Sequence, residues 1–372
     1  MSTARINFLT DIRFGFGALG EIGAVLEERS ISRPLVVTDA ALAGLGMVDR
    51  LGIKAAAVFD RVESNPTEHR AIEGLEVFRT HRCDGLVAVG GGSPIDLAKA
   101  IALGVNHPGP LEQYALIHDG LGRITADLPP LVAIPTTAGT GSEVGRAALI
   151  TLATGDKLAL ISPHLIPDAA ICDPELTRSL PASLTAATGM DAIAHCVENF
   201  CSPRFNPVAD AIALDGLERA VRHIRRATAE PDDREARAEM MMAALEGGLT
   251  FQKGLGGVHA LSHPLGALAT RPHHGTLNAI FLPHVLRFNA DAGAQKIRAM
   301  ANRLGLGESG DLPDTFARLC KDLKLPAHLG SLGITASDVE PLGPKALADH
   351  CSPSNPRPMT LEDCHQLYRA AL

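Results

Sequence analysis

Four of the fifteen histidines lie within residues 256–278, namely His259, His263, His273 and His274. In a helix over residues 257–268, side chains four positions apart share one face, so His259 and His263 would point into a single cavity. Pro264 predicts that this helix bends or ends near His263. Such breaks are common where a helix contributes to a site, and both imidazoles would still face one way.

A second pair occurs upstream, where Asp191 and His195 stand four apart inside an apolar run over residues 182–200. One carboxylate and several imidazoles suit a divalent transition metal. Imidazole binds iron, zinc, copper and nickel, whereas an oxygen-only set favours magnesium or calcium. Taken alone, either pair could equally be a polar pair on a helix surface or include a buried histidine whose hydrogen bonds are all made within the protein. Because both pairs are embedded among Ala, Ile, Leu and Val, together they favour a metal site.

A glycine turn carries the other candidate chemistry. A predicted strand over residues 84–89 runs into Gly90, Gly91, Gly92 and Ser93, and Pro94 then lies near the first turn of a predicted helix. Without side chains, such a turn lets a pyrophosphate approach the backbone, where the N–H groups that open the helix meet it; Ser93 adds a hydroxyl. A tight structural turn is the rival explanation. The turn matches neither Gly-x-Gly-x-x-Gly nor a Walker loop, so phosphoryl transfer is disfavoured.

A second loop of small residues, over residues 134–143, also follows a predicted strand and contains Thr136 and Thr137. Two such loops at strand ends are where an open α/β sheet binds a nucleotide. Asp39 ends another predicted strand, and its carboxylate would bind the ribose hydroxyls of adenosine and repel a 2′-phosphate. These features favour NAD over NADP.

The elements that must position these residues differ between the two halves of the chain. Before residue 180, the pattern predicts a helix over residues 68–81 and strands over residues 34–39, 55–59, 84–89, 131–134, 147–151, 158–161 and 169–172. Apolar strands that alternate with helices are typical of a parallel sheet covered on both faces. We therefore expect a mostly parallel α/β sheet in this half.

After residue 180, alanine-rich segments with helical periodicity follow one another, separated by Gly, Pro and Asn. The pattern predicts helices over residues 182–200, 206–229, 232–252, 274–290, 292–304, 312–324 and 360–372. A chain of 372 residues is too long for a single typical core. We expect two domains, an α/β domain over residues 1–180 and an all-α domain over residues 181–372.

Composition and charge exclude several classes of protein. Hydrophobic residues make up 46% and charged residues 20%, as in an ordinary globular protein, and the net charge of -8 argues against nucleic acid or an anionic membrane as the main partner. The N-terminal sequence lacks a signal-peptide pattern, and no run approaches the roughly 18 apolar residues of a membrane span, so we expect a cytoplasmic protein. The seven cysteines contain no Cys-x-x-Cys and indicate reduced thiols.

The order of these motifs resembles the iron-containing (group III) alcohol dehydrogenase family, and the resemblance covers nearly the whole chain. The motifs are Gly-Gly-Gly-Ser-x-x-Asp-x-Ala-Lys at 90–99, Pro-Thr-Thr-Ala-Gly-Thr-Gly-Ser-Glu at 135–143, the helix with Asp191 and His195, Gly-x-x-His-Ala-x-x-His-Pro-Leu-Gly-Ala at 256–267, and His-Gly-x-x-Asn at 274–278. The resemblance implies a dehydroquinate synthase-like fold, with a dinucleotide-binding α/β domain followed by an all-α domain and with metal and substrate in the cleft between them.

The resemblance also implies roles for individual residues. The implied metal ligands are Asp191, His195, His259 and His274. The implied NAD-binding residues are Asp39, Asn65, Gly91, Gly92, Ser93, Thr136, Thr137 and Lys157. His263 corresponds to a proton relay near the nicotinamide, Asp96 to an acid at the nicotinamide end, and Phe251 and Cys351 to the lining of the alcohol pocket.

Two positions depart from the family pattern. The Pro-His-Gly of the family is Pro272-His273-His274-Gly275 here, so alignment on Pro272 selects His273 as the last ligand, whereas alignment on Gly275 and Asn278 selects His274. We favour His274 because it keeps the following helix in register. Gly145 stands where many members have a threonine that contacts the nicotinamide ribose.

The resemblance implies an NAD-dependent alcohol dehydrogenase or aldehyde reductase for small primary alcohols or hydroxyacid semialdehydes, with Fe²⁺ as the expected metal and Zn²⁺ compatible with the same ligands. Arg146 and Arg357 are candidates to receive a substrate carboxylate. We expect a homodimer or a higher homo-oligomer, as in the family. The alternatives are an enzyme similar to glycerol dehydrogenase or maleylacetate reductase, and a dehydroquinate synthase-like lyase that shows no net NADH change. A non-catalytic nucleotide-binding protein would not need converging ligands.

Overall fold

The structure is a computed structural model that describes residues 6–268, 270, 272–307 and 311–372. It divides into two compact units. The α/β unit consists of Phe8–Thr137 and Gly141–Arg178, and the helical unit consists of Ser179–Leu372, Ala138–Thr140 and the described part of Met1–Asn7. Residues 1–5, on which part of the signal-peptide expectation rests, lie outside the described residues. Each unit is described by itself below.

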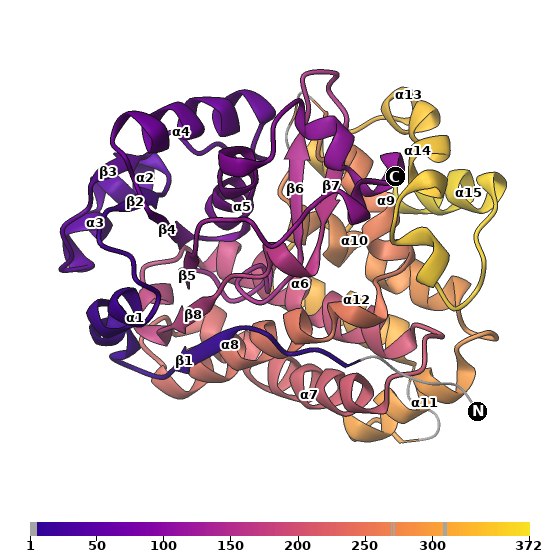
Figure 1. The fold of residues 1–372 in the computed structure, drawn as a ribbon. Coiled ribbons are helices and arrows are strands. Elements are labelled where there is room, and N and C mark those ends of the chain that lie inside the picture. Colours follow the sequence, from indigo (N-terminus) through magenta and orange to yellow (C-terminus); the bar gives the residue numbers. More distant parts are fainter. Residues whose placement is uncertain (1–5, 269, 271, 308–310) are drawn as a thin grey trace. The chain divides into compact units, whose positions relative to one another are not determined.

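The α/β unit is built on a parallel sheet with the strand order β1-β8-β5-β4-β2-β3 (Figure 1). Its strands are β1 Asp11–Phe14, β2 Pro34–Val37, β3 Ala57–Phe59, β4 Gly85–Gly90, β5 Leu131–Pro135 and β8 Ala169–Cys172. Its helices are α1 Ile22–Glu28, α2 Ala40–Gly44, α3 Met47–Arg50, α4 Glu68–Thr80 and α5 Gly92–Asn106. The parallel sheet that the sequence predicts is therefore confirmed.

Two of the predicted strands do not join this sheet. β6 Ala147–Thr151 and β7 Lys157–Ile161 pair with each other as a separate antiparallel ribbon. The connection between them is a tight turn in which Leu152 N–H donates to Asp156 O at 2.9 Å and Gly155 has a φ of 85°. A parallel pair needs a crossover of about a dozen residues or more, so a turn this short enforces antiparallel pairing.

Both faces of the parallel sheet are buried, which explains why its strands are apolar throughout. Side chains of β2 alternate between two hydrophobic clusters. Leu35 packs in a cluster with Phe78 of α4 and Ile101 of α5, whereas Val36 packs in a cluster with Val25 of α1 and Met47 of α3. Helices therefore cover both faces of the sheet, and the loops at the carboxyl ends of the strands remain to carry ligand-binding residues.

The helical unit is organised around α6, which packs against α7, α8 and α10 (Figure 1). Its helices are α6 Ala182–Cys201, α7 Pro207–Ala229, α8 Arg234–Leu249, α9 Gly257–Leu265, α10 His274–Phe288, α11 Ala294–Arg303, α12 Leu312–Asp322, α13 Ala336–Val339, α14 Gly343–Ala348 and α15 Leu361–Ala371. From Thr185 to Cys201 every residue of α6 is buried. A helix that is apolar on all sides belongs in the middle of its unit, so polar side chains on α6 need partners within the interior.

α9 ends as the sequence predicts. Its last residue is Leu265, two positions after His263, and Pro264 lies in its last turn.

Of the helices in the part of the chain that the structure describes, none combines the length and apolar character that a bilayer crossing requires.

A half-buried carboxyl group between α7 and α8 makes stability depend on pH. Glu246 lies in α8, with its Oε1 3.6 Å from Arg219 Nε. Burial raises its pKa to about 8, and the negative charge of Asp215 adds to this effect. Because the folded pKa exceeds the unfolded value, this group's contribution to stability is full below about pH 4.5 and is lost as pH rises through 8. Glu246→Gln should therefore raise the free energy of unfolding at pH 8 by about 1–2 kcal/mol, a figure reduced from the full effect of the pKa shift because solvent screens part of the charge. At pH 4.5 the substitution should leave the free energy of unfolding nearly unchanged.

Thermal unfolding of the two proteins at both pH values measures this difference. Glu239→Gln is the matched control, because Glu239 also pairs with Arg219, at 2.6 Å, and removal of its charge should bring no gain at pH 8. An equal gain in both variants would contradict the assignment to Glu246.

Candidate metal and dinucleotide sites

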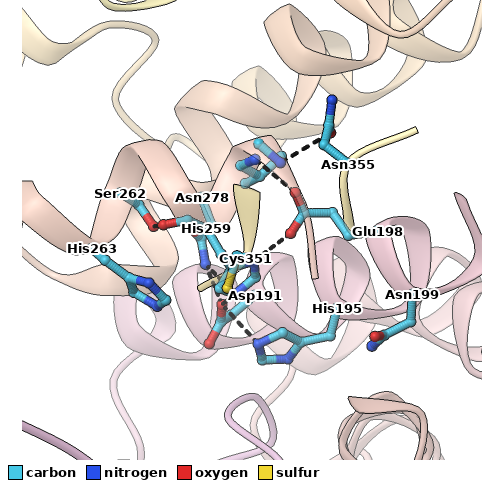
Figure 2. A network of polar contacts seen from close by, with 12 residues as sticks. Asp191, His195, Glu198, Asn199, His259, Ser262, His263, Asn278, Cys351 and Asn355 are labelled. Carbon is cyan, nitrogen blue, oxygen red and sulfur yellow. Dashed lines mark hydrogen bonds and ion pairs between the residues drawn. The ribbon is translucent and has the colours of Figure 1, made fainter. Parts of the chain in front are cut away.

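Asp191 and His195 lie one turn apart on α6, buried with 2% and 3% of their surfaces exposed. Asp191 Oδ1 is 3.6 Å from Nε2 of His195 and 3.7 Å from Nε2 of His259, which comes from α9. It is also 3.8 Å from Nε2 of His274, the first residue of α10. Figure 2 shows the first three of these side chains directed toward one another. Three helices thus bring three imidazole nitrogens around one carboxylate oxygen.

The outer nitrogens of two of these imidazoles are already engaged. His195 Nδ1 lies 3.1 Å from the carbonyl oxygen of Gly139. His259 Nδ1 lies 2.5 Å from Glu198 Oε2, a contact that Figure 2 shows. A carbonyl and a carboxylate can only accept, so each Nδ1 carries a proton, and whenever the ring is neutral its Nε2 presents a lone pair inward. A histidine held by a carboxylate or a carbonyl in this way is typical of metal ligation.

Asn278 occupies the point where these donors converge. Its Nδ2 donates to Asp191 Oδ1 at 2.6 Å and lies 3.0 Å from His259 Nε2 and 3.1 Å from His274 Nε2. An amide NH₂ has two hydrogens for these three acceptors, and Asn278 Oδ1 is buried with no hydrogen-bond partner among the described residues. One carboxylate oxygen and three imidazole nitrogens fit a divalent transition-metal ion better than they fit an amide.

The charges of the cluster agree with this reading. Burial raises the pKa of Asp191, but the neighbouring His195 and His274 outweigh it and hold that pKa well below its usual range. Burial lowers the pKa of His195 to about 4, against the opposing charge of Asp191. Burial also lowers the pKa of His259, but Glu198 and Asp191 together raise it to about 9. A cation at His259 Nε2 would therefore have to displace a proton.

Of the two adjacent histidines, the structure brings His274 to Asp191. Its position depends on Gly275, because a Cβ on Gly275 would lie 2.2 Å from the carbonyl oxygen of Ala187 on α6. Only glycine permits α10 to approach α6 this closely. His273 precedes α10 as its N-cap, and its buried Nδ1 has no hydrogen-bond partner among the described residues.

The other residues expected at this site lie beside the cluster. The ring of Phe251 contacts that of His195 in an edge-to-face arrangement, with centroids 4.8 Å apart and 81° between the planes. His263 stacks on His274 at 5.4 Å, and its Nδ1 lies 2.9 Å from Asp349 Oδ2. Cys351 is buried, and its backbone N–H donates to Asp349 Oδ1 at 2.8 Å.

Sequence reasoning missed Glu198 and Asp349. Glu198 could have been found, because Asp191, His195 and Glu198 recur at the spacing of one helix face. Asp349 had no such signal, because it contacts His263 across 86 positions of sequence.

Glu198 gives a direct test of the inferred metal site. Glu198→Gln should weaken metal binding by about 10–100-fold, because it removes the charge that holds His259 and raises the basicity of its inner nitrogen. Its Oε1 also accepts from Val258 N–H at 2.6 Å, a bond that the glutamine oxygen can keep. Competition with a chromogenic chelator measures the affinity. Glu235→Gln, at an exposed position on α8, should bind metal as the wild type does, and equal affinity in all three proteins would exclude the role of Glu198.

The loops expected to bind the dinucleotide meet within the α/β unit. Gly90 of β4 is in register with Pro135 of β5, and Thr136 N–H donates to Gly90 O at 3.0 Å. Gly91 caps α5, and a Cβ there would lie 3.2 Å from Thr137 Oγ1, which is buried with no partner among the described residues. A side chain would fill this space, so the glycine and the unsatisfied hydroxyl form a cradle at the start of a helix that fits a pyrophosphate.

Gly92 and Ser93 are the first residues of α5 and are half-buried. Asp39 follows β2 and caps α2, with its Oδ1 accepting from Leu42 N–H at 2.9 Å. The chain runs from β2 outward to β3 and then returns to β4 on the other side of β2. The crevice at such a reversal is where open α/β sheets bind nucleotides, and Asp39 and the glycine turn follow the two strands that border it.

Asn65 and Lys157 are brought together as well. Lys157 Nζ donates to Asn65 Oδ1 at 2.7 Å, and Asn65 has a φ of 58° in the left-handed region. This bond joins the start of β7 to the segment that follows β3.

Asp96 has a structural environment that the sequence did not indicate. Its Oδ1 accepts from Ser142 Oγ at 2.6 Å and its Oδ2 from Leu149 N–H at 3.0 Å. Lys99, on the next turn of α5, lies 4.0 Å away and donates to three carbonyl oxygens, those of Ser142, Gly145 and Ala147. Burial raises the pKa of Asp96 against the charge of Lys99. Both carboxylate oxygens are thus used, one to hold Ser142 of the second loop and the other to hold Leu149 of β6 after it.

Comparison with known proteins agrees with this arrangement. The chain matches the family profile of iron-containing alcohol dehydrogenase over residues 10–174 and that of the C-terminal domain of the Fe-containing alcohol dehydrogenase family over residues 185–372. It is 47% identical to a 4-hydroxybutyrate dehydrogenase of Cupriavidus necator, over 99% of this chain and 100% of the relative. It is 38% identical to a 1,3-propanediol dehydrogenase of Klebsiella pneumoniae, over 96% of each. The crystal structure of a 1,3-propanediol oxidoreductase superposes with a TM-score of 0.92 and 36% identity, covering 99% of this chain and 100% of that one.

The fold and the cluster of one acid and three histidines are those of a dinucleotide-dependent oxidoreductase with a candidate metal site. The chain belongs to the iron-containing alcohol dehydrogenase family. It is thus an NAD-dependent alcohol dehydrogenase or aldehyde reductase, as the sequence motifs predict.

Proposed function

We propose that this chain interconverts an ω-hydroxy acid and its semialdehyde, with NAD as the hydride carrier and Fe²⁺ as the metal. The proposed ligands are Asp191, His195, His259 and His274. The observation that supports this set most strongly is the approach of three imidazole Nε2 atoms to within 3.6 to 3.8 Å of the single oxygen Asp191 Oδ1. Zn²⁺ accepts the same ligands, so metal analysis must decide between the two ions.

When bound, the metal would supply Lewis acidity toward the alcohol oxygen and NAD would supply the hydride acceptor. The protein's own side chains have to bind, orient and move protons. Asp349 holds Nδ1 of His263 at 2.9 Å, which leaves Nε2 of that ring as the nitrogen that can take up and release a proton. We assign the proton relay to this His263 and Asp349 pair. Phe251 covers the face of the cluster beside His195 and restricts water there.

The proposed NAD-binding residues all belong to the α/β unit: they are Asp39, Asn65, Gly91, Gly92, Ser93, Thr136, Thr137 and Lys157. Asp39 would receive the ribose hydroxyls and the start of α5 the pyrophosphate. For Asp96 we propose a positioning role rather than proton transfer, because its two oxygens accept hydrogen bonds from Ser142 of the second loop and from Leu149 of β6.

The substrate class is proposed from the relatives. The protein with 47% identity is a 4-hydroxybutyrate dehydrogenase and the one with 38% identity is a 1,3-propanediol dehydrogenase. The substrates for which these two relatives are named are short chains that end in a primary alcohol, and the first also carries a carboxylate. Arg357 is a poor receptor for it, because its guanidinium lies 3.9 Å from the ring of Phe288 and 3.4 Å from Asp363. Arg146 is the other candidate that the sequence indicated. Short diols are the second candidate substrates.

A substrate panel tests this proposal. NADH formation should be fastest with 4-hydroxybutyrate, slower with 1,3-propanediol and 1-butanol, and slowest with glycerol, in protein purified anaerobically and analysed for iron and zinc. Arg146→Met should raise KM for 4-hydroxybutyrate and leave KM for 1-butanol unchanged. Equal rates with 4-hydroxybutyrate and 1-butanol would contradict the hydroxyacid assignment, and the absence of net NADH formation with every alcohol would favour a lyase similar to dehydroquinate synthase.

A further inference from the structure

We infer that the helical unit holds a second metal site, distinct from the Asp191 cluster and suited to a soft divalent ion such as Zn²⁺. Its ligands are His263, Asp349, His350 and Cys351, which we call the Cys351 site. One ligand atom from each of these four residues lies within 4.8 Å of the other three.

The spacing within the Cys351 site approaches that of tetrahedral coordination. Each of the four residues contacts another: His263 Nδ1 is 2.9 Å from Asp349 Oδ2, His350 Nδ1 is 3.5 Å from Asp349 Oδ1, and His350 Nε2 is 3.4 Å from Cys351 Sγ. An ion would take one nitrogen of His350 and one oxygen of Asp349, and the four ligand atoms that it would take lie within 4.8 Å of one another. In a tetrahedral zinc site with bonds of about 2.0 Å to nitrogen or oxygen and 2.3 Å to sulfur, neighbouring ligand atoms lie about 3.3–3.5 Å apart. Ligand atoms as far as 4.8 Å apart would have to approach one another by about 1 Å to reach this spacing, which side-chain rotations can provide.

The position of the site in the fold favours binding over chance proximity. Asp349, His350 and Cys351 are consecutive and follow α14 in a turn, so one short segment supplies three ligands to the fixed face of α9. His263 and His350 stack with ring centroids 5.4 Å apart and 11° between their planes. His263 and Cys351 are buried, with 3% and 2% of their surfaces exposed. A partly dry site with two imidazoles, a carboxylate and a thiol has the composition that zinc prefers.

Sulfur separates the two sites chemically. The Asp191 cluster offers only oxygen and nitrogen atoms, whereas the Cys351 site includes a thiol, and thiolate favours zinc over the harder Fe²⁺. We therefore expect iron to bind at the Asp191 cluster and zinc to bind at the Cys351 site.

A metal at the Cys351 site would inhibit the enzyme, a consequence that rests on the proposed role of His263. Nδ1 of His263 cannot donate to Asp349 and coordinate an ion at once. An ion there would also bind the carboxylate that orients the ring. While the ion is bound, His263 and Asp349 could therefore not transfer a proton. We therefore expect reversible inhibition by Zn²⁺ that lowers kcat.

Cobalt provides the direct test, because Co²⁺ bound to a thiolate gives a charge-transfer absorption in the near ultraviolet that nitrogen and oxygen ligands do not give. Protein whose first site is loaded with iron should develop this band with one further equivalent of Co²⁺. The band should persist in Asp191→Ala and in the matched control Cys320→Ser, which alters another buried cysteine of the same unit, and disappear in Cys351→Ser. No band in the wild type, or loss of the band in Asp191→Ala, overturns the proposal.

His350→Gln covers the case in which Cys351→Ser does not fold. It should raise the Co²⁺ concentration for half-maximal absorption, and the Zn²⁺ concentration for half-maximal inhibition, by at least about tenfold. Unchanged values for this variant contradict the site. If no alcohol is turned over at all, the proposed function fails, and the cobalt band still decides the second site.

Discussion

Replacing Asp191 by alanine is expected to remove the bound metal and to lower kcat/KM for alcohol oxidation by at least about a thousandfold, equivalent to about 4 kcal/mol of transition-state stabilisation. Asp191 is the single anion that three imidazoles share, at 3.6, 3.7 and 3.8 Å from its Oδ1. Without it, three neutral rings would have to hold a dication in a buried place, where an uncompensated charge is strongly unfavourable. Metal content and steady-state kinetics measure the two effects on the same sample.

Two further variants separate the loss of metal from a loss of fold. Asp191→Asn keeps an oxygen toward Asn278 but lacks the charge, so it should fold and still bind metal poorly. Asp322→Ala removes an exposed aspartate of α12 that pairs with Arg225 at 2.8 Å, and it should retain metal and activity. Full activity of Asp191→Ala with its metal stripped would refute the assigned ligand set.

The secondary structure was largely predictable because periodicity and apolar content arise from burial. α4 was expected over residues 68–81 and spans Glu68–Thr80, since its buried positions recur at helical spacing. β1 was not expected, because this edge strand is only half-buried and its Asp11 and Arg13 pair with each other at 3.1 Å. Its sequence therefore lacks the apolar pattern of the central strands.

The site was predictable only in part. The spacing of Asp191 and His195 is enough to place both on one helix face. The sequence does not show that α9 and α10 approach that same face, because the approach depends on packing contacts such as Gly275 against Ala187 O, 88 positions away. For Asp96 the motif suggested a role at the nicotinamide end, whereas the structure shows its carboxylate bound to Ser142 and Leu149. These partners could not be predicted, because only the fold brings their segment to Asp96.

Lys99→Met is expected to cost about 3–5 kcal/mol of folding free energy, a larger effect on stability than any surface change. Lys99 is fully buried, and its Nζ donates to the carbonyl oxygens of Ser142, Gly145 and Ala147 at 2.8, 2.9 and 2.8 Å. Burial lowers its pKa to about 8, so it still carries its charge at neutral pH. Methionine fills much of the same volume but leaves three buried acceptors and the Asp96 carboxylate without a cation.

Chemical denaturation at pH 7 measures the loss, and Lys54→Met, at an exposed position, should show none. The double variant Lys99→Met, Asp96→Asn tests the physical reason. Removing one partner of a buried pair leaves an uncompensated charge, whereas removing both leaves only unpaired dipoles, so the double variant should recover part of the stability. The single variant Asp96→Asn completes the comparison. If the losses of stability in the two single variants add up to the loss in the double variant, Lys99 and Asp96 are not coupled. In that case Lys99 acts only through the three carbonyl groups that it binds.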